Sequence, residues 1–424
     1  MSKKVVLVWF RNDLRLHDNE VLSEAINKSD LIIPVYFFDP RYYSKNKFHN
    51  YKTGLKRAQF QLESVSHLKE KLQSMDSDLM TFVGKPEEIL PKLCAKYEVM
   101  EVYHHREVAS RETQISELVE SALWENKINL RHFIGHTLFH KEDLPFPIKD
   151  IPDKFNIFRK KIERESSVRN PLDAPTSIQS PQHLEQTSIP SLQDLGFPED
   201  EIIQMPKKDM EGGEDIAFEK LNTVLDPNYT GNENFSLISP YIAVGSLSPI
   251  FVYHRMQSSG LSQNKKRYDR LMTMLLWRDY FRFMLKKYPN IFFKPMGTKN
   301  NSTVDIPALT VNEELFEKWK SGQTDPDFIN STMIQLKKTG YIPYQAGLIA
   351  ASYLVHEYQV NWLKGASWFE EQLLDYSPAT VYGQWSHVAG VGTSEKDNKA
   401  LDWQKLIKTN FPNGLPKLDE LFAK

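Results

Sequence analysis

The chain is long enough for two domains, and its charge and cysteine content limit what it can be. Its 424 residues include 53 lysines and arginines and 55 aspartates and glutamates, so no global field attracts nucleic acid. Contact with DNA would have to come from a local basic patch. The single cysteine, Cys94, excludes an internal disulfide and a cysteine-ligated iron–sulfur cluster. It fits a reducing cytosol, so we expect a cytoplasmic protein.

No stretch has the length and apolar composition of a membrane span, so we predict no contact with a membrane. The N-terminal sequence MSKKVVLVWF has a short apolar run that leads directly into charge, which indicates a first strand and not a signal peptide. The 12 histidines show no metal-ligand spacing. His104 and His105 are adjacent, and on a strand their side chains would point to opposite faces, which favours structural roles over a metal site.

The first 140 residues alternate between strand and helix patterns. Short apolar runs rich in β-formers predict strands at 5–9, 31–38, 79–83, 99–104 and 130–134. Helical periodicity between them predicts helices at 55–73, 87–97 and 112–125. This alternation is typical of a doubly wound parallel sheet, which we predict for residues 1–140. No Gly-x-Gly-x-x-Gly follows the first strand, so this sheet is not expected to hold a dinucleotide in Rossmann fashion.

Residues 141–215 differ from the segments on either side. They are rich in Pro, Ser and Gln and show little periodicity, which predicts a long surface linker. From residue 216 to residue 424 the pattern is helical, so we predict an all-helical second domain over 216–424. The predicted fold class is therefore an α/β domain with a parallel sheet followed by an all-α domain.

The stretch 339–392 is the most organised part of the predicted helical domain. Apolar residues recur at helical spacing after Pro343, and proline suits a helix start because its missing N–H would have no partner there. A second helix is predicted near 364–374, followed by Asp375, a Ser-Pro turn and a Gly-rich segment that carries Trp385. Taken alone, the three tryptophans of this stretch indicate the core of a large helical bundle.

Motif order favours a more specific interpretation. The motifs ASYLV, WFEEQLLDY and AGVG resemble the helical FAD-binding domain of the photolyase/cryptochrome superfamily, and in detail its DASH branch. The resemblance extends to the N-terminal half, where VWFRNDLRLHDN at 8–19 and GHTLFHKEDLPF at 135–146 are similar to family signatures. It implies a photolyase-type antenna domain joined by a linker to a helical domain that binds FAD.

The resemblance also implies positions for the cofactor. The segment NFSLISPYIAVGSLSP at 234–249 is similar to the one whose serines hold the flavin pyrophosphate, and hydroxyls with free N–H groups at a helix start favour anionic oxygens. Without a ligand, the same Ser-Pro pattern would be an ordinary helix N-cap. Arg278 would face phosphate, and other matched positions would lie beside the flavin ring. The implied cofactor-binding residues are Ser236, Ser239, Arg278, Asp375, Ser377 and Val381.

Three tryptophans carry the chemistry that the resemblance implies. Trp385 and Trp362 match the proximal and middle members of the relay that brings an electron to photoexcited flavin. The outer member falls at Leu309, which cannot be oxidised. Trp277 would line the substrate cavity; the alternative is that Trp277 and Phe281 form an ordinary i,i+4 core pair.

The sequence departs from the family around the flavin. The replaced positions are Phe235, Tyr344, Gly347, Ser377 and Val381. The family arginine at position 347 pairs with the aspartate that is kept here as Asp375. A buried aspartate without its cation should protonate, pair elsewhere or meet water, because an isolated buried charge is costly. We therefore predict that FAD binding is weak or lost.

Two further departures lie on the substrate side. Met274 stands where the family has a glutamate that binds the flipped pyrimidine dimer, and His387 replaces an aromatic residue. The family often carries a folate antenna near the domain interface. Glu107 is a candidate contact for it, and the alternative is a solvated carboxylate at the end of a strand.

Three functions follow from these residues. The first is a blue-light photoreceptor of the cryptochrome type, with weakened FAD binding, weak or lost DNA repair and an unidentified protein partner. The second is a flavin-free descendant that acts as a binding or structural protein. The third is an enzyme, a light-dependent deoxyribodipyrimidine photolyase that acts on dimers in single-stranded DNA. Met274 and His387 argue against the enzyme.

Overall fold

The computed structural model describes residues 3–206, 210–229, 234–297, 312–393 and 402–416. Within these ranges, the side chains of Asn234 and Ser236 are not described. Among the described helices, none combines the length and apolar composition needed to cross a bilayer. The same residues contain no group of three or more His, Cys, Asp or Glu side chains placed to hold a metal ion.

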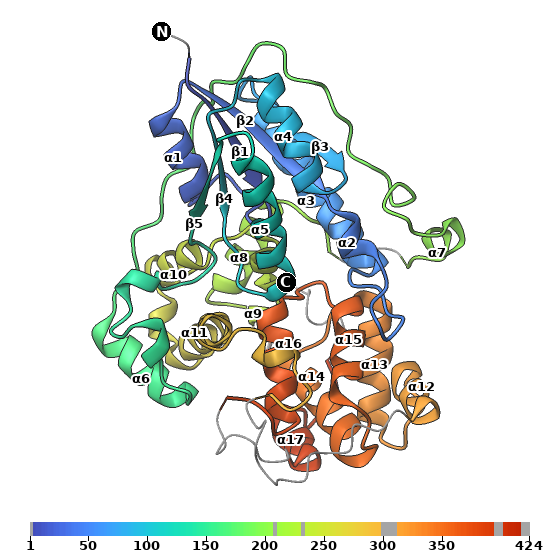
Figure 1. Ribbon diagram of the computed structural model, residues 1–424. Coiled ribbons are helices and arrows are strands. Elements are labelled where there is room, and N and C mark those ends of the chain that lie inside the picture. Colours follow the sequence, from blue (N-terminus) through green and yellow to red (C-terminus); the bar gives the residue numbers. More distant parts are fainter. Residues whose placement is uncertain (1–2, 207–209, 230–233, 298–311, 394–401, 417–424) are drawn as a thin grey trace.

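The N-terminal part is a parallel sheet with helices on both faces (Figure 1). Its strand order is β3-β2-β1-β4-β5, so the chain reverses direction across the sheet between β1 and β4. The strands are β1 (Val5–Phe10), β2 (Leu31–Phe38), β3 (Met80–Val83), β4 (Glu101–His105) and β5 (Asn129–Phe133). The predicted doubly wound parallel sheet is confirmed, with strand ends within two residues of the prediction.

Alternation along the strands explains the two layers of helices. Val5, Leu7 and Trp9 share a core with α4 (Pro86–Lys96) and α5 (Ser110–Trp124). The residues between them on β1 face α1 (Glu20–Lys28) and α3 (Leu55–Gln73). Because both faces are covered, the central strands β1 and β2 are apolar along their whole length. The short helix α2 (Pro40–Tyr43) follows β2.

The segment predicted as a linker contains a helix that packs into the core. Residues 141–215 include two 3-10 turns, η1 (Lys141–Asp143) and η2 (Ile148–Asp150), and the helices α6 (Phe155–Glu165) and α7 (Glu199–Ile203). On α6, Phe155, Phe158 and Ile162 are buried. The rest runs along the α/β domain (Figure 1), where Asp18 N donates to Leu172 O and Ile32 N to Gln179 O, both at 2.8 Å. The Pro/Ser-rich surroundings hid the helical spacing of α6.

The second part of the chain is helical, and every strand of the described residues lies before residue 134. The predicted helix after Pro343 is α14, which begins at the next residue, and the one predicted at 364–374 is α15. The helices are α8 (Glu214–Leu225), α9 (Asn234–Val244), α10 (Pro249–Ser258), α11 (Lys265–Lys287), α12 (Glu313–Ser321), α13 (Asp327–Thr339), α14 (Tyr344–Ser352), α15 (Trp362–Gln372), α16 (Pro378–Val388) and α17 (Trp403–Asn410), with the 3-10 turns η3 (Leu261–Gln263) and η4 (Ile291–Phe293) and the π-turn η5 (Tyr353–Glu357).

The loop after β1 ties the two parts together. Arg15 Nη1 donates to Gly245 O at 3.0 Å, and Glu214 accepts bonds from the backbone N–H groups of Leu16 and His17. Gly245 has φ +79°, and a Cβ there would lie 1.8 Å from Asn12 O, so only glycine fits. One hydrophobic core runs through both parts, so the boundaries at residues 140 and 215 stay predictions.

Candidate functional site

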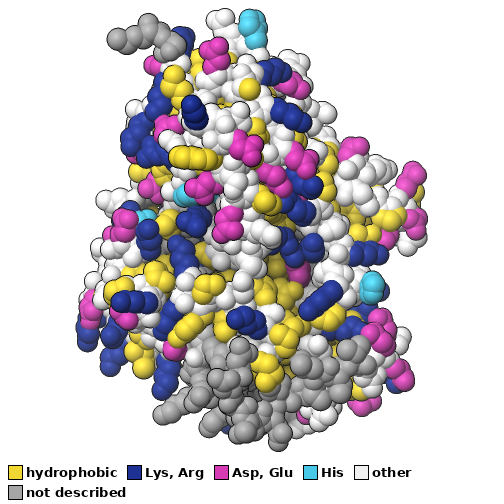
Figure 2. Space-filling model, viewed as in Figure 1, with side chains coloured by type: hydrophobic (Ala, Val, Ile, Leu, Met, Phe, Trp, Pro, Cys, Tyr) yellow, Lys and Arg dark blue, Asp and Glu magenta, His cyan; other side chains and the backbone are white. Residues whose placement is uncertain are grey.

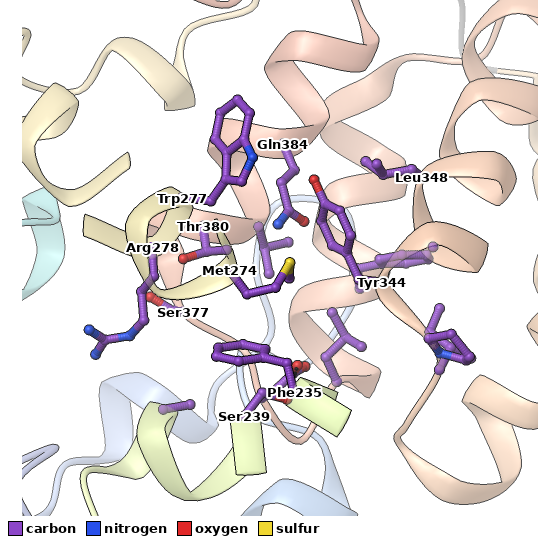
Figure 3. A pocket seen from close by; sticks show the side chains of 18 of the residues that line it. Phe235, Ser239, Met274, Trp277, Arg278, Tyr344, Leu348, Ser377, Thr380 and Gln384 are labelled. Carbon is purple, nitrogen blue, oxygen red and sulfur yellow. Dashed lines mark hydrogen bonds between the residues drawn. The ribbon is translucent and has the colours of Figure 1, made fainter. Parts of the chain in front are cut away.

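A cavity of about 920 Å³, partly open to solvent, lies among α9, α11, α14 and α16 (Figure 3). Three of these helices, α9, α14 and α16, begin at its wall. Helix N-termini favour negative charge, because their first N–H groups have no partner within the helix. The predicted site residues that line the cavity are Ser239, Trp277, Arg278, Asp375, Ser377, Val381 and Trp385. The Ser236 side chain lies outside the described residues.

Asp375 pairs with a hydroxyl in place of a cation. The Ser239 hydroxyl donates to Asp375 Oδ2 at 2.7 Å. Burial raises the pKa of the Asp375 carboxyl, and the bond from Ser239 opposes this shift without overcoming it. The expectation that this aspartate pairs elsewhere is therefore confirmed, and its partner comes from the segment predicted to hold pyrophosphate.

Arg278 is bound to the neighbouring domain. Its guanidinium Nη1 donates to the carbonyl of His136, and in Figure 3 it points away from Met274 and Tyr344. The next residue, Asp279, accepts bonds from Leu138 N at 3.0 Å and from Phe139 N at 2.9 Å. Burial, with a further contribution from the nearby Arg282 charge, lowers the pKa of Arg278 to about 9. The arginine expected to face phosphate thus bridges two domains.

The residues that replace the family pattern lie in the cavity wall. Phe235, Met274 and Tyr344 point into it in Figure 3, with the Met274 thioether near the middle. Burial raises the pKa of the Tyr344 hydroxyl above its usual range. At Gly347 a Cβ would meet Ile342 Cδ1 and Phe369 Cε2, each at 3.4 Å. That distance is at the edge of ordinary contact, so a Cβ at position 347 would not clash with its neighbours.

Trp277 is stacked between aromatic neighbours. Its indole lies parallel to the Phe155 ring, with centroids 3.6 Å apart and an angle of 9°. Phe281 stacks at 5.2 Å, so the ordinary i,i+4 pair is present as well. A second opening, lined by Trp277, Phe155, Tyr344 and His387 among others, adjoins the cavity. Sequence reasoning missed Phe155; the signal was the apolar spacing along α6.

The two tryptophans expected to relay electrons, Trp385 and Trp362, have different neighbours. The Trp385 ring meets Trp319 edge to face at 6.1 Å and Phe369 at 5.1 Å. Trp362 is buried, and its indole N–H donates to Pro295 O at 3.1 Å. Leu309 lies outside the described residues. Trp319, which sequence reasoning did not propose, is therefore a ring neighbour of Trp385.

Glu107 is not solvated, so that alternative was wrong. Arg282 Nη2 donates to Glu107 Oε2 and Asn12 Nδ2 to Oε1, both at 3.0 Å, at the interface of the two parts. Burial opposes ionisation, but the charges of Arg282 and Arg11 and the hydrogen bond from Asn12 outweigh it and hold the Glu107 pKa well below its usual range. Whether Glu107 also contacts an antenna stays a prediction.

The adjacent histidines point to opposite faces of the sheet, as predicted. The His104 ring stacks on Trp9, with centroids 4.9 Å apart, and its Nε2 is hydrogen-bonded to His132 Nδ1 at 2.8 Å. His105 Nδ1 lies 2.8 Å from Asp13 Oδ2. Both histidines are therefore held by protein groups.

A second cavity, of about 870 Å³, lies at the carboxyl ends of β1 and β2. Its wall includes Arg11, Asp39 and Glu112 from the α/β domain and Glu370 and Tyr376 from the helical domain. The carboxyl ends of parallel strands, where strand order reverses, are the usual ligand-binding place of doubly wound sheets. Trp9, Phe10, Arg11 and Asn12 in this wall belong to the motif at 8–19, but the sequence did not indicate that this motif lines a cavity.

Comparisons with known proteins agree with both halves of the fold. Residues 6–177 match the family described as DNA photolyase, and residues 271–404 match the FAD binding domain of DNA photolyase. Cryptochrome DASH from Gloeobacter violaceus is 35% identical over 98% of this chain and 85% of its own length. Cryptochrome DASH, chloroplastic/mitochondrial, from Arabidopsis thaliana is 33% identical over 97% of this chain and 74% of its own length. The crystal structure of a Synechocystis cryptochrome has a TM-score of 0.88 at 32% identity, over 97% of this chain and 88% of that chain.

Proposed function

The chain belongs to the DASH branch of the cryptochrome/photolyase family of flavoproteins, and on this premise we propose that it is a blue-light photoreceptor with weakened FAD binding and weak or lost DNA repair. One observation carries the proposal. In the cavity, Asp375 has the hydroxyl of Ser239 as its partner where the family has an arginine. We expect a cytoplasmic protein that signals through a protein partner.

The cavity fits a flavin ring better than it fits the whole dinucleotide. Its wall is largely apolar, and Trp385 and Phe369 offer aromatic surface beside Ser377 and Gln384. The hydroxyl of Ser239 and the cation of Arg278 already have protein partners. When bound, a flavin would supply absorption of blue light and accept an electron.

Lost polar contacts support weak binding of FAD. Phe235 and Gly347 offer no side-chain donor, and Ser377 offers a hydroxyl in place of a carboxylate. A typical hydrogen bond contributes about 0.5–1.5 kcal/mol net, and more when one partner is charged. About 1.4 kcal/mol corresponds to a tenfold change in affinity, so several such losses weaken binding by orders of magnitude.

Two contacts support the loss of repair. The Met274 thioether is only a weak acceptor for a thymine N–H, and an unpaired polar edge of a buried base costs about 1–3 kcal/mol. One face of Trp277 is covered by Phe155, which reduces the surface on which a flipped base could stack. The stacking and hydrogen-bond energy that should offset the cost of base extrusion is therefore reduced.

Weak contact with single-stranded or damaged DNA is supported by a basic helix beside the second opening. In Figure 2, lysines and arginines gather at the lower left, where Figure 1 places α6. The basic residues of α6 and its N-cap are Lys154, Arg159, Lys160, Lys161 and Arg164. Lys154 also lines the opening. This is the local patch that a chain of near-zero net charge needs to attract phosphate.

The antenna remains part of the proposal. The cavity at the carboxyl ends of β1 and β2 has the position and the mixed lining expected for a second chromophore, such as a folate. A photolyase from Sulfolobus tokodaii is described with two FAD molecules and a novel light-harvesting cofactor. Folate fluorescence in the purified protein, lost in Arg11→Ala, would support this assignment.

The absorbance spectrum of freshly purified protein tests the proposed function. We expect substoichiometric flavin that dialysis removes and added FAD partly restores. Stoichiometric, dialysis-resistant FAD would contradict weak binding. No flavin uptake at any concentration would favour the flavin-free alternative, which the bond between Ser239 and Asp375 also supports because it satisfies the site without a ligand.

A further inference from the structure

The charges around the cavity among α9, α11, α14 and α16 are unfavourable for a diphosphate. Among the described side chains that line it, Arg278 is the only cation and Asp375 the only carboxylate. A diphosphate is anionic over the whole physiological pH range. It therefore needs either a free cation or unoccupied helix N-termini.

The cation is not free. Arg278 is 7% exposed, and its guanidinium donates to the His136 carbonyl. To reach a phosphate in the cavity, it would have to leave that carbonyl buried and without its donor, which costs stability. It would also have to leave the domain interface, where the following residue, Asp279, is held by two backbone N–H groups.

The N-terminus of α16 lies next to a carboxyl group in the chain. Asp375 lies just before α16, and its carboxylate accepts the Ser239 hydroxyl of α9. Burial raises the pKa of this carboxyl group, whereas the positive end of the α16 dipole favours its ionised form. A phosphate group brought to the same place would meet a like charge in a partly buried site, where repulsion is stronger than in water.

The rest of the cavity suits a planar, uncharged ring system. Phe235, Phe369 and Trp385 supply aromatic surface. Three polar side chains line the same cavity from α16 and its N-cap: Ser377, Thr380 and Gln384. The Thr380 hydroxyl is buried and has no partner among the described residues, so it is available to a ring carbonyl or N–H.

We propose that this cavity binds the flavin ring but disfavours the diphosphate, so that riboflavin binds more tightly than FAD. This inference rests on the proposed flavin binding, and it names the part of the cofactor that the chain no longer holds. The ligand class is an uncharged isoalloxazine with a neutral side chain. FMN should also bind less tightly than riboflavin, because its phosphate monoester carries a charge of about −1.5 to −2 near neutral pH, close to that of the FAD diphosphate.

The test is a titration of the full-length protein, stripped of ligand and kept in the dark, with riboflavin, FMN and FAD, followed by flavin fluorescence anisotropy. We expect the dissociation constant of riboflavin to be lower than that of FAD by about tenfold or more, a difference of about 1.4 kcal/mol. Tighter or equal binding of FAD would overturn the inference and leave the flavoprotein function intact. Binding of none of the three would overturn both.

A substitution that adds a cation gives a second, independent readout. Gly347→Arg adds a guanidinium to the wall that holds Asp375, and a Cβ at position 347 would contact Ile342 and Phe369 without a clash. It should raise the affinity for FAD about tenfold while riboflavin changes less. Gly347→Gln, a shorter uncharged side chain, is the control and should not favour FAD. Equal effects of the two variants would contradict the electrostatic argument. If neither variant folds, the relative affinities of the wild-type protein for riboflavin and FAD still test the proposal.

Discussion

The ring of Phe155 lies parallel to the indole of Trp277, with centroids 3.6 Å apart and an interplanar angle of 9°. Phe155 belongs to α6, inside the segment whose composition predicts a surface linker, and Trp277 belongs to α11 at the cavity. The contact therefore fixes the position of α6 against the helical domain. Any change at Phe155 should affect stability and the access to Trp277 together.

Removal of the Phe155 ring should destabilise the protein. Phe155→Ala should lower the free energy of unfolding by about 3–5 kcal/mol, because a buried aromatic side chain is lost and a cavity remains. Urea denaturation measures this change, and acrylamide quenching of tryptophan fluorescence should rise. The control is Ile157→Ala on the same helix, where the side chain is 46% exposed and the change should stay within about 0.5 kcal/mol. Equal costs for both variants would show that the stack is not formed in solution.

Repair of pyrimidine dimers should be absent in the wild type and recoverable by substitution. With FAD and a reductant supplied, irradiated single-stranded oligonucleotide should keep its dimers under blue light, because the Met274 thioether is only a weak acceptor for the base. Met274→Glu combined with Val381→Asn and Gly347→Arg should restore light-dependent dimer loss. Chromatography of the digested oligonucleotide measures it. Turnover by the wild type at a photolyase-like yield would refute this expectation.

Photoreduction should be slow even when flavin is bound. Leu309, at the outer relay position, cannot be oxidised, so a hole that reaches Trp362 has no further tryptophan in the expected relay. Leu309→Trp should accelerate the loss of oxidised-flavin absorbance under blue light with an external thiol, whereas Leu309→Phe should not. Rapid photoreduction of the wild type would instead indicate another donor, and Trp319→Phe would test the ring neighbour of Trp385.

The carboxyl groups of Asp375 and Glu107 should respond to pH in opposite directions. Burial raises the pKa of Asp375 above its ordinary value of 3.8, so its ionised form costs stability at neutral pH. Asp375→Asn should therefore stabilise the protein at neutral pH. The gain should shrink as the pH falls through the raised pKa towards 3.8, where the carboxyl is protonated in both the folded and the unfolded chain.

Glu107 has a pKa shift in the opposite direction to that of Asp375. Its pKa is held below the ordinary 4.5, so the ionised carboxylate adds stability above pH 4.5 that is lost as the pH falls through the lowered value. Glu107→Gln should cost about 3–5 kcal/mol at neutral pH, because it leaves Arg282 buried without its partner, and less in acid. Urea denaturation over a pH series measures both variants. Parallel pH profiles for the two would contradict the assigned shifts.

The local pattern of the sequence predicted the elements that depend on periodicity. The strands β1 and β2 were recognisable because both faces of the sheet are covered and these strands are continuously apolar. Helix α3 was predicted with its observed ends at residues 55 and 73. Motif order was enough to predict the family. The replacements at Phe235, Met274 and Gly347 were also visible, and all three lie in the wall of one cavity.

The tertiary structure decided which groups meet. Arg278 binds the carbonyl of His136, 142 residues away, and Glu107 binds Arg282 across 175 residues. Periodicity shows that such residues are buried, but it carries no information about a partner so distant in the chain. Burial of a charge makes a partner necessary, and only the packing of the two domains against each other determines which partner is within reach.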